Sequence, residues 1–258
     1  MLDGPAFYDD PAVFDTYRQA RARATSPNEL IEEPLVLALL GPVAGLRILD
    51  LGCGDAAFGR RLLADGCASY LGIDASRRML RRARIELRGT CGAVLRQRME
   101  RFTAPPGSFD RVVSRLALHY VEDLASVLVT VQALLVPGGT LVFSVEHPVI
   151  TSCSAGWDPC TPRTNWIVDQ YFAIERRETS WLGGRVVKYH RTVEDYVALV
   201  QQAGFRLEAL REGRPERSRM PSEAEFERRR RIPLFLVIGA AVAARNERAN
   251  ISKGPDRG

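Results

Sequence analysis

The stretch RILDLGCGD, residues 47–55, constrains the fold of this chain more than any other segment. Its apolar run, residues 48–51, is typical of a short buried strand. Gly52 and Gly54 then permit a tight turn whose backbone a ligand can approach closely. A helix with core-facing apolar spacing begins near Phe58. The sequence therefore predicts a strand, a ligand-binding turn and a helix, in that order.

A second short apolar run, residues 70–74, ends in Asp74, which lies 20 residues after Gly54. In a doubly wound sheet, an acid at the end of this strand accepts the two hydroxyl groups of a nucleotide ribose. A lone Gly-x-Gly is more often an ordinary turn. Here, however, the turn is part of an ordered series of strand, turn, helix, strand and acid. This order and spacing favour a nucleotide site in an α/β sheet.

The nucleotide could be a dinucleotide or another adenosine-containing cofactor. The third glycine of the dinucleotide fingerprint is missing, because the turn continues to Ala57, and Asp50 precedes the first glycine. A carboxylate there fits poorly beside a pyrophosphate and well beside an ammonium group. Here the sequence resembles the class I S-adenosylmethionine-dependent methyltransferases, whose first motif places such an acid and such glycines around the amino acid part of the cofactor. In that resemblance Asp74 is the ribose-binding acid.

The resemblance implies a fold and a cofactor. The fold is α/β: a Rossmann-like doubly wound seven-stranded sheet with an antiparallel last strand, an N-terminal helical lid and an insertion after the fifth strand. The cofactor is S-adenosylmethionine, with S-adenosylhomocysteine as product. A more specific likeness, over about residues 14–244, is to a bacterial small-molecule subgroup with Glu-His-Pro at 146–148 and Tyr-His-Arg-Thr at 189–192.

The same resemblance divides the chain into five parts. Pro137, Gly138 and Gly139 break a helix before the apolar fifth strand, which is another feature shared with the family. The parts are an N-terminal helical cap at 1–45, the cofactor-binding Rossmann-like core at 46–148, a substrate-covering insertion at 149–190, the C-terminal part of the core at 191–244 and a flexible tail at 245–258.

The residues that the resemblance places at the cofactor come from the N-terminal segment, the glycine turn and the loops after the second, third and fourth strands. The family often has an Asp where Arg98 stands here, so recognition of the adenine amino group is expected to pass to Glu100. The expected set is Tyr17, Arg21, Asp50, Gly52, Cys53, Gly54, Asp74, Ala75, Met79, Met99, Glu100, Leu116 and His119.

All three histidines of the chain fall at predicted carboxyl ends of strands or in the covering insertion. We expect His147 and His190 to accept a proton from the substrate, with Glu146 as an orienting or ion-pairing partner. His119 and Tyr120 are expected nearer to the cofactor. The alternative is that each imidazole only packs or caps a loop.

Between residues 149 and 188 the pattern is irregular and rich in aromatic side chains. A stretch of irregular chain this long is usually either functional or disordered, and disorder does not suit so many aromatic residues. We therefore expect the insertion to cover the substrate pocket. The expected substrate contacts are Tyr120, Trp157, Trp166 and Tyr171.

Composition argues against several other classes of protein. The 258 residues, 46% hydrophobic and 26% charged, suffice for one substantial core, and a formal charge of +5 does not indicate a nucleic-acid partner. There is no apolar run of about 18 residues and no basic-plus-apolar leader, so we expect a cytoplasmic protein that does not bind membranes. Five cysteines without Cys-x-x-Cys spacing predict neither a metal site nor a disulfide framework.

We therefore predict an enzyme that transfers a methyl group from S-adenosylmethionine to an O or N nucleophile, with C as a further option, of a small molecule in specialised metabolism. Two alternatives stay open. One is another reaction of the same cofactor, such as an internal attack that releases methylthioadenosine, or a rearrangement. The other is a methyltransferase of RNA or protein, or a binder without catalysis. The sequence identifies neither the acceptor nor the oligomeric state.

Overall fold

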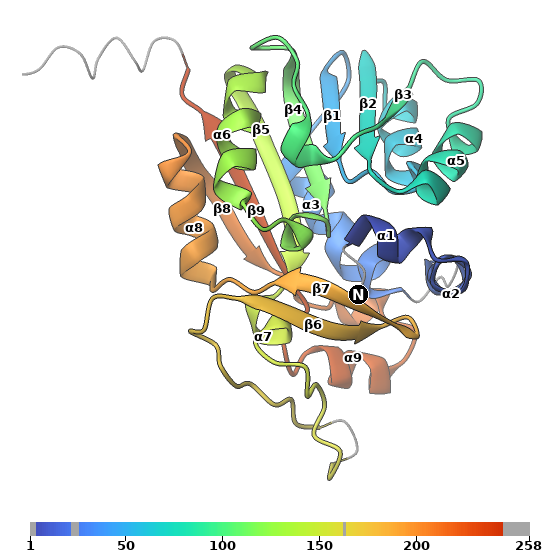
Figure 1. The fold of residues 1–258 in the computed structure, drawn as a ribbon, viewed down its shortest axis with the longest axis vertical. Coiled ribbons are helices and arrows are strands. Elements are labelled where there is room, and N and C mark those ends of the chain that lie inside the picture. Colours follow the sequence, from blue (N-terminus) through green and yellow to red (C-terminus); the bar gives the residue numbers. More distant parts are fainter. Residues whose placement is uncertain (1–3, 22–25, 162–163, 245–258) are drawn as a thin grey trace, which may run out of the picture.

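The computed structural model describes residues 4–21, 26–161 and 164–244 (Figure 1). Within these residues, one seven-stranded sheet has the order β3-β2-β1-β4-β5-β9-β8. Neighbouring strands from β3 to β5 are parallel, whereas β9 runs antiparallel to both β5 and β8. The predicted α/β sheet with an antiparallel last strand is therefore confirmed. The strands are β1 (Arg47–Leu51), β2 (Ser69–Asp74), β3 (Ala93–Arg96), β4 (Phe109–Arg115), β5 (Leu135–Glu146), β8 (Phe205–Glu212) and β9 (Phe235–Val242).

Helices cover both faces of the sheet, because alternate strand residues point to opposite faces. Leu49 and Leu51 belong to the core that packs under α6 and α8, while Ile48 belongs to the core under α3, α4 and α5. Ser76 and Thr192 cap α5 and α8, because their hydroxyl groups accept hydrogen bonds from backbone N–H groups of the first turn. The helices are α3 (Glu33–Leu40), α4 (Ala57–Ala64), α5 (Arg77–Glu86), α6 (Leu124–Leu134) and α8 (Val193–Gln202).

The remaining elements gather at the carboxyl edge of the parallel strands. Strand order changes direction between β1 and β4, and open α/β sheets bind ligands at the carboxyl ends beside such a point. Figure 1 shows α1, α2 and the hairpin of β6 and β7 together at this end of the sheet. These elements are α1 (Gly4–Asp9), α2 (Pro11–Arg21), the π-helical η1 (Asn28–Glu32), η2 (Met99–Arg101), η3 (Leu118–Tyr120), α7 (Pro148–Thr151), β6 (Arg176–Trp181), β7 (Gly184–Tyr189), η4 (Arg217–Arg219) and α9 (Glu223–Arg229).

The structure corrects the prediction of an irregular stretch between residues 149 and 188. Its second half is a regular antiparallel hairpin, which forms a two-stranded sheet of its own. Leu182 and Gly183 at the tip both have positive φ, as a two-residue hairpin turn requires, and this pair was the available sequence signal. Three consecutive charged residues, 176–178, hide the strand pattern of β6. The short helix α9 was not predicted either.

No helix in the described ranges is both long and apolar enough to cross a membrane. The predicted tail at 245–258 lies outside the described residues. The five-part division of the chain remains a prediction.

Helix α4 packs closely on β2, and this packing fixes a side chain that supports the glycine turn. A Cβ atom on Gly59 would lie 2.1 Å from Cζ of Tyr70, so this helix position has no room for a side chain. The Tyr70 ring is buried, and its hydroxyl donates a hydrogen bond of 2.7 Å to Oδ2 of Asp50. Gly59 thus fulfils the close-packing role of the third fingerprint glycine that is missing at Ala57.

We expect Gly59→Ala to lower the free energy of unfolding by about 1 to 3 kcal/mol, because the added methyl group overlaps the fixed Tyr70 ring. The same change at an unobstructed helix position stabilises a protein by up to about 1 kcal/mol. Urea unfolding measures the difference. The control is Gly59→Ala in a Tyr70→Leu background, where the cost should largely disappear; an equal cost in both backgrounds would refute the packing argument.

Candidate functional site

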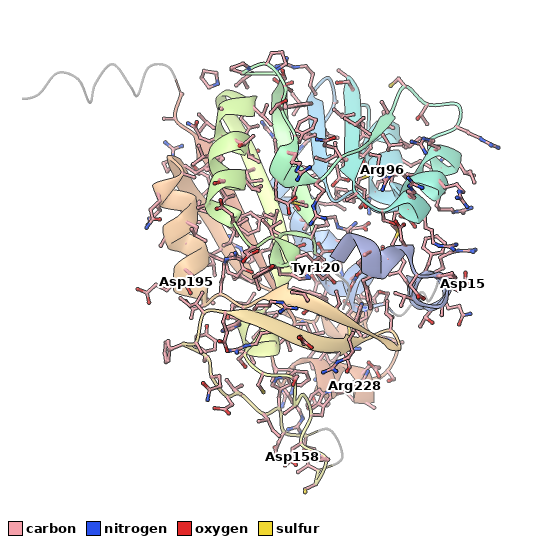
Figure 2. The ribbon with its side chains drawn as sticks, in the orientation of Figure 1. Asp15, Arg96, Tyr120, Asp158, Asp195 and Arg228 are labelled. Carbon is pink, nitrogen blue, oxygen red and sulfur yellow. The ribbon has the colours of Figure 1, made fainter. Side chains whose placement is uncertain are left out.

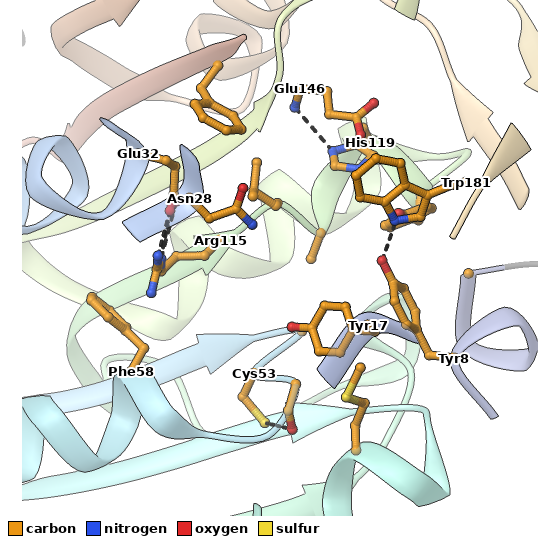
Figure 3. Close-up of a pocket in the computed structure, with 18 of the residues that line it drawn as sticks. Tyr8, Tyr17, Asn28, Glu32, Cys53, Phe58, Arg115, His119, Glu146 and Trp181 are labelled. Carbon is orange, nitrogen blue, oxygen red and sulfur yellow. Dashed lines mark hydrogen bonds and ion pairs between the residues drawn. The ribbon is translucent and has the colours of Figure 1, made fainter. Parts of the chain in front are cut away.

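A cavity of about 790 Å³ lies along the carboxyl ends of β1, β2, β4 and β5. One part is lined by the glycine turn and by acidic residues, which we call the cofactor part. The other, which we call the acceptor part, is lined mainly by residues from the N-terminal segment, the stretch after β5, the hairpin and α9. Figure 3 shows Tyr8, Tyr17, Asn28, His119 and Trp181 projecting into the same space.

The glycine turn brings the loops after β1 and β4 into contact. Gly52 and Gly54 have φ of +75° and +57°, and a Cβ atom on Gly52 would lie 2.4 Å from Cβ of Ala117. Leu116, which also lines the cavity, has φ of +52°. Positive φ in a leucine costs backbone strain, and such residues cluster at functional sites.

Asp74 is fixed at the end of β2 by two backbone donors. The N–H of Gly54 donates to Oδ2 at 3.0 Å, and the N–H of Ser76 donates to Oδ1 at 2.8 Å. Burial raises the pKa of Asp74 to about 6, although these hydrogen bonds lower it. Each oxygen keeps a lone pair, which suits the two hydroxyl groups of a ribose.

Asp50 is a buried acid at the edge of the cavity, only 2% exposed. Burial raises its pKa to about 7 and outweighs the hydrogen bond from Tyr70 and the positive charge of Arg115. Ionising the buried carboxyl group of Asp50 costs free energy, and a nearby ammonium group would stabilise the ionised form. Asp50 and Asp74, with the glycine turn between them, therefore fit the amino acid and ribose parts of S-adenosylmethionine.

The structure brings together all but one of the predicted cofactor residues. Met79, Met99 and Glu100 line the cofactor part with Asp74, and Tyr17 reaches it from α2. Arg21 ends α2, but its side chain lies outside the described atoms. The contacts themselves remain predictions. The other predicted residues that line the cavity are Asp50, Gly52, Cys53, Gly54, Ala75, Leu116 and His119.

A buried cluster surrounds Arg115, and it was not predicted from the sequence. Its guanidinium donates to Glu32 at 2.5 Å and to Glu33 at 2.8 Å, and it lies 4.5 Å from the centre of the Phe58 ring. Burial disfavours this charge, but Glu32 and Glu33 outweigh it and raise the pKa of Arg115. Asn28 lines the cavity beside this cluster (Figure 3). A lone Arg at a strand end and two acids before Pro34 gave no sign that they would meet.

The three histidines are placed differently from one another. His119 is buried and lines the cavity, and its Nδ1 accepts a long hydrogen bond of 3.4 Å from the N–H of Glu146, which leaves its proton on Nε2. Burial lowers the pKa of His119 to about 4. The imidazole is therefore neutral at physiological pH.

The structure does not bring His147 and His190 to the cavity wall. Nδ1 of His147 accepts from the N–H of Val149, while its Nε2 lies 3.0 Å from Glu212. Nδ1 of His190 lies 2.7 Å from the Thr151 hydroxyl, and Nε2 lies 2.9 Å from the carbonyl oxygen of Tyr171. Burial lowers the pKa of both imidazoles.

Both ring nitrogens of each of these histidines are thus engaged in holding loops together. This is the alternative that the sequence left open, and the geometry favours it over the predicted proton transfer.

Glu146 does lie in the cavity wall, but its partner is Lys188 and not a histidine. The ammonium of Lys188 lies 2.7 Å from both carboxylate oxygens and is almost fully buried. Burial raises the pKa of Glu146, but the positive charge of Lys188 outweighs this effect and the pKa stays below its usual value. Lys188 lies on β7, so this ion pair ties the hairpin to the end of β5.

Aromatic side chains line much of the acceptor part. Trp157 and Trp166 pack edge to face with ring centres 5.3 Å apart, and Trp181 reaches the cavity from the hairpin. The hydroxyl groups of Tyr8 and Tyr120 lie 3.1 Å apart. Of the predicted substrate residues, Trp157, Trp166 and Tyr120 line the cavity and Tyr171 does not, whereas Tyr8, Trp181 and Leu182 were not predicted.

The chain is similar to known methyltransferases. Residues 49–143 match the family described as a methyltransferase domain. An S-adenosylmethionine-dependent methyltransferase from Mesorhizobium loti has 37% sequence identity and a TM-score of 0.77, with 86% of this chain and 99% of that chain covered. An uncharacterised protein of Haemophilus influenzae is 32% identical over 80% of this chain and 85% of its own. A ubiquinone biosynthesis O-methyltransferase of Ralstonia nicotianae is 33% identical over 54% of this chain and 62% of its own.

We expect Asp50→Asn to stabilise the ligand-free protein while weakening cofactor binding. The unfolded carboxyl has a pKa near 3.8 and the folded one about 7, so the cost of ionising Asp50 grows as the pH rises from 3.8 to 7. At pH 8 the variant should be more stable by about 1 to 3 kcal/mol, and at pH 4 the two proteins should be nearly equal. Chemical unfolding at both pH values tests this.

The same variant should bind S-adenosylmethionine at least about tenfold more weakly at pH 8, because a charged partner of its ammonium group is lost. Wild-type affinity should fall below pH 7 as Asp50 is protonated, and the variant should lack this dependence. Calorimetric titration measures both. Asp65→Asn is the control, since Asp65 is exposed and does not line the cavity. Unchanged affinity in Asp50→Asn would refute the assignment.

Proposed function

The chain belongs to the class I S-adenosylmethionine-dependent methyltransferases, and from this premise we propose that its acceptor is a small molecule methylated on oxygen or nitrogen. The observation that carries the proposal is the walled acceptor part of the cavity. Tyr8 from the N-terminal segment, Trp157 from the stretch after β5 and Trp181 from the hairpin all face it. Walls from three separate segments suit an acceptor that is enclosed on several sides.

One of the relatives supports an oxygen acceptor. The Ralstonia relative is named as an O-methyltransferase of ubiquinone biosynthesis. Aromatic side chains such as Trp157, Trp166 and Trp181 favour flat, apolar acceptor groups through ring contacts. A small molecule with an aromatic or similarly flat body therefore fits this wall best.

Catalysis in this site rests mainly on position and on exclusion of water. When bound, S-adenosylmethionine supplies a methyl group that its positively charged sulfur already activates. The task of the chain is to hold the acceptor atom in line with that group, at about 3 to 3.5 Å, in a space closed by the N-terminal segment and the hairpin. The buried pairs of Arg115 with Glu32 and of Lys188 with Glu146 hold η1 and the hairpin against the strand ends.

The acceptor part contains no strong base among its described side chains. Burial raises the pKa of Tyr8 to about 12 and raises that of Tyr120 well above its usual value, so both hydroxyl groups stay protonated. Glu146 is ionised but bound on both oxygens by Lys188. His119 is neutral and carries its proton on Nε2, so it can donate a hydrogen bond to the acceptor. Such a site suits an amine that arrives neutral or a hydroxyl that is acidic by itself.

The test of the proposed function is product analysis with purified protein and S-adenosylmethionine over a panel of phenols, aromatic acids and amines. We expect S-adenosylhomocysteine to accumulate in equal amount with a methylated product. Release of methylthioadenosine, or turnover confined to RNA or protein substrates, would contradict it.

We assign His119, in place of His147 and His190, as the imidazole that faces the acceptor. His119→Ala should lower kcat by about tenfold to a hundredfold, since one hydrogen-bond donor to the reacting group is lost. Between pH 6 and 9 the rate should show no titration of His119, because its pKa is about 4.

The matched comparison is the double variant His147→Ala, His190→Ala. It should melt at a lower temperature, because it loses hydrogen bonds that hold the loops, yet keep kcat within about threefold at a temperature where it is folded. Circular dichroism confirms folding, and initial rates are compared with those of His119→Ala. A folded double variant without turnover would restore the predicted proton transfer.

A further inference from the structure

We propose that the acceptor carries an anionic group, a carboxylate or a phosphate, and that Arg228 on α9 binds it. This inference rests on the proposed function, because it concerns the acceptor of the same cavity. Arg228, Arg229 and Glu225 all line that cavity, together with Trp157 and Trp166. In the view of Figure 2, Tyr120 and Arg228 lie on opposite sides of the hairpin.

The charges that line the cavity are unevenly distributed. The cofactor part carries the carboxyl groups of Asp50, Asp55, Asp74 and Glu100, which suits a positively charged cofactor. The same carboxyl groups repel an anion. An anionic acceptor would therefore bind with its charged group away from them, and α9 lines the cavity with two guanidinium groups.

The other cations near the acceptor part are already paired. Arg115 is bound by Glu32 and Glu33, and Lys188 is bound by both oxygens of Glu146. Both side chains already have carboxylate partners, so neither requires an anionic ligand.

The pairing of Arg228 is different, because its carboxylate partner is shared. Oε2 of Glu225 lies 2.5 Å from one nitrogen of Arg228 and 3.5 Å from Nε of Arg229. Because Glu225 is shared with Arg229, its carboxylate does not fully neutralise Arg228.

Arg228 also has a donor without an acceptor. Its Nε is buried and has no hydrogen-bond partner among the described residues. Leaving a buried donor unpaired is unfavourable, and a shift of the Arg228 side chain toward an anionic ligand would let a ligand oxygen satisfy it. Guanidinium groups bind carboxylates and phosphates in a two-pronged geometry that uses Nε and a terminal nitrogen together. The aromatic pair of Trp157 and Trp166 in the same wall would pack on the body of such a ligand.

Calorimetric titration of the protein saturated with S-adenosylhomocysteine tests the inference without requiring turnover. The probes are matched pairs: indole-3-acetate and cinnamate against their methyl esters, and phenyl phosphate against phenol. At least one anionic probe should bind about tenfold or more tightly than its neutral partner, since a charged hydrogen bond is gained. The pairs also show whether a carboxylate or a phosphate is preferred.

Three variants locate the effect. Arg228→Met should abolish the preference for the anion, whereas Glu225→Gln should increase it severalfold, because the competing carboxylate is removed. Arg230→Met is the control: Arg230 lies two positions further along, pairs with Glu227 at 2.8 Å and does not line the cavity. It should leave all affinities unchanged.

The proposal is overturned if no anionic probe binds more tightly than its neutral partner, including the case in which no probe binds. It is also overturned if Arg228→Met and Arg230→Met behave alike. Failure of S-adenosylhomocysteine itself to bind would instead contradict the proposed function, so the two failures are distinguishable.

Discussion

The buried ion pair between Arg115 and Glu32 joins the N-terminal segment to the carboxyl edge of the sheet. Burying two charges costs free energy, which only close contact and further hydrogen bonds offset. Here Glu33 binds the same guanidinium, and the Ser144 hydroxyl donates to Glu32 at 2.5 Å. The N–H of Leu116 donates to Ser144 in turn, so that η1 and the ends of β4 and β5 form one network. The part of the cavity wall formed by Glu32, Arg115 and Leu116 depends on this network.

The hairpin is anchored by the same kind of interaction on the adjacent strand. Arg115 ends β4 and Glu146 ends β5, so each covering segment is joined to a strand end by one buried pair of opposite charges. Removing one member of such a pair leaves an uncompensated buried charge, which is far more costly than losing both. The two segments therefore have a defined position over the cavity, which the charge pairs fix together with the apolar packing of Phe7 and Val13 against Val186 of the hairpin.

The cofactor part could be predicted from the sequence because each of its features is set by near neighbours in the chain: a buried strand runs into glycines with positive φ, and Asp74 ends the next strand. The acceptor part could not be predicted in this way. The partners of His147 and His190 are Glu212 and Tyr171, which lie far away in the sequence, and no local pattern shows that these bonds form. The same holds for the walls that α9 and the hairpin contribute.

The hairpin of β6 and β7 forms a sheet of its own and shares no strand ladder with the seven-stranded sheet. It nevertheless places Trp181 and Leu182 in the cavity wall. Substitutions along it can therefore reshape the wall without altering the strand register that supports the glycine turn. The hairpin and the core are thus separate structural units, so the shape of this wall can change while the core that carries the glycine turn keeps its strand pairing.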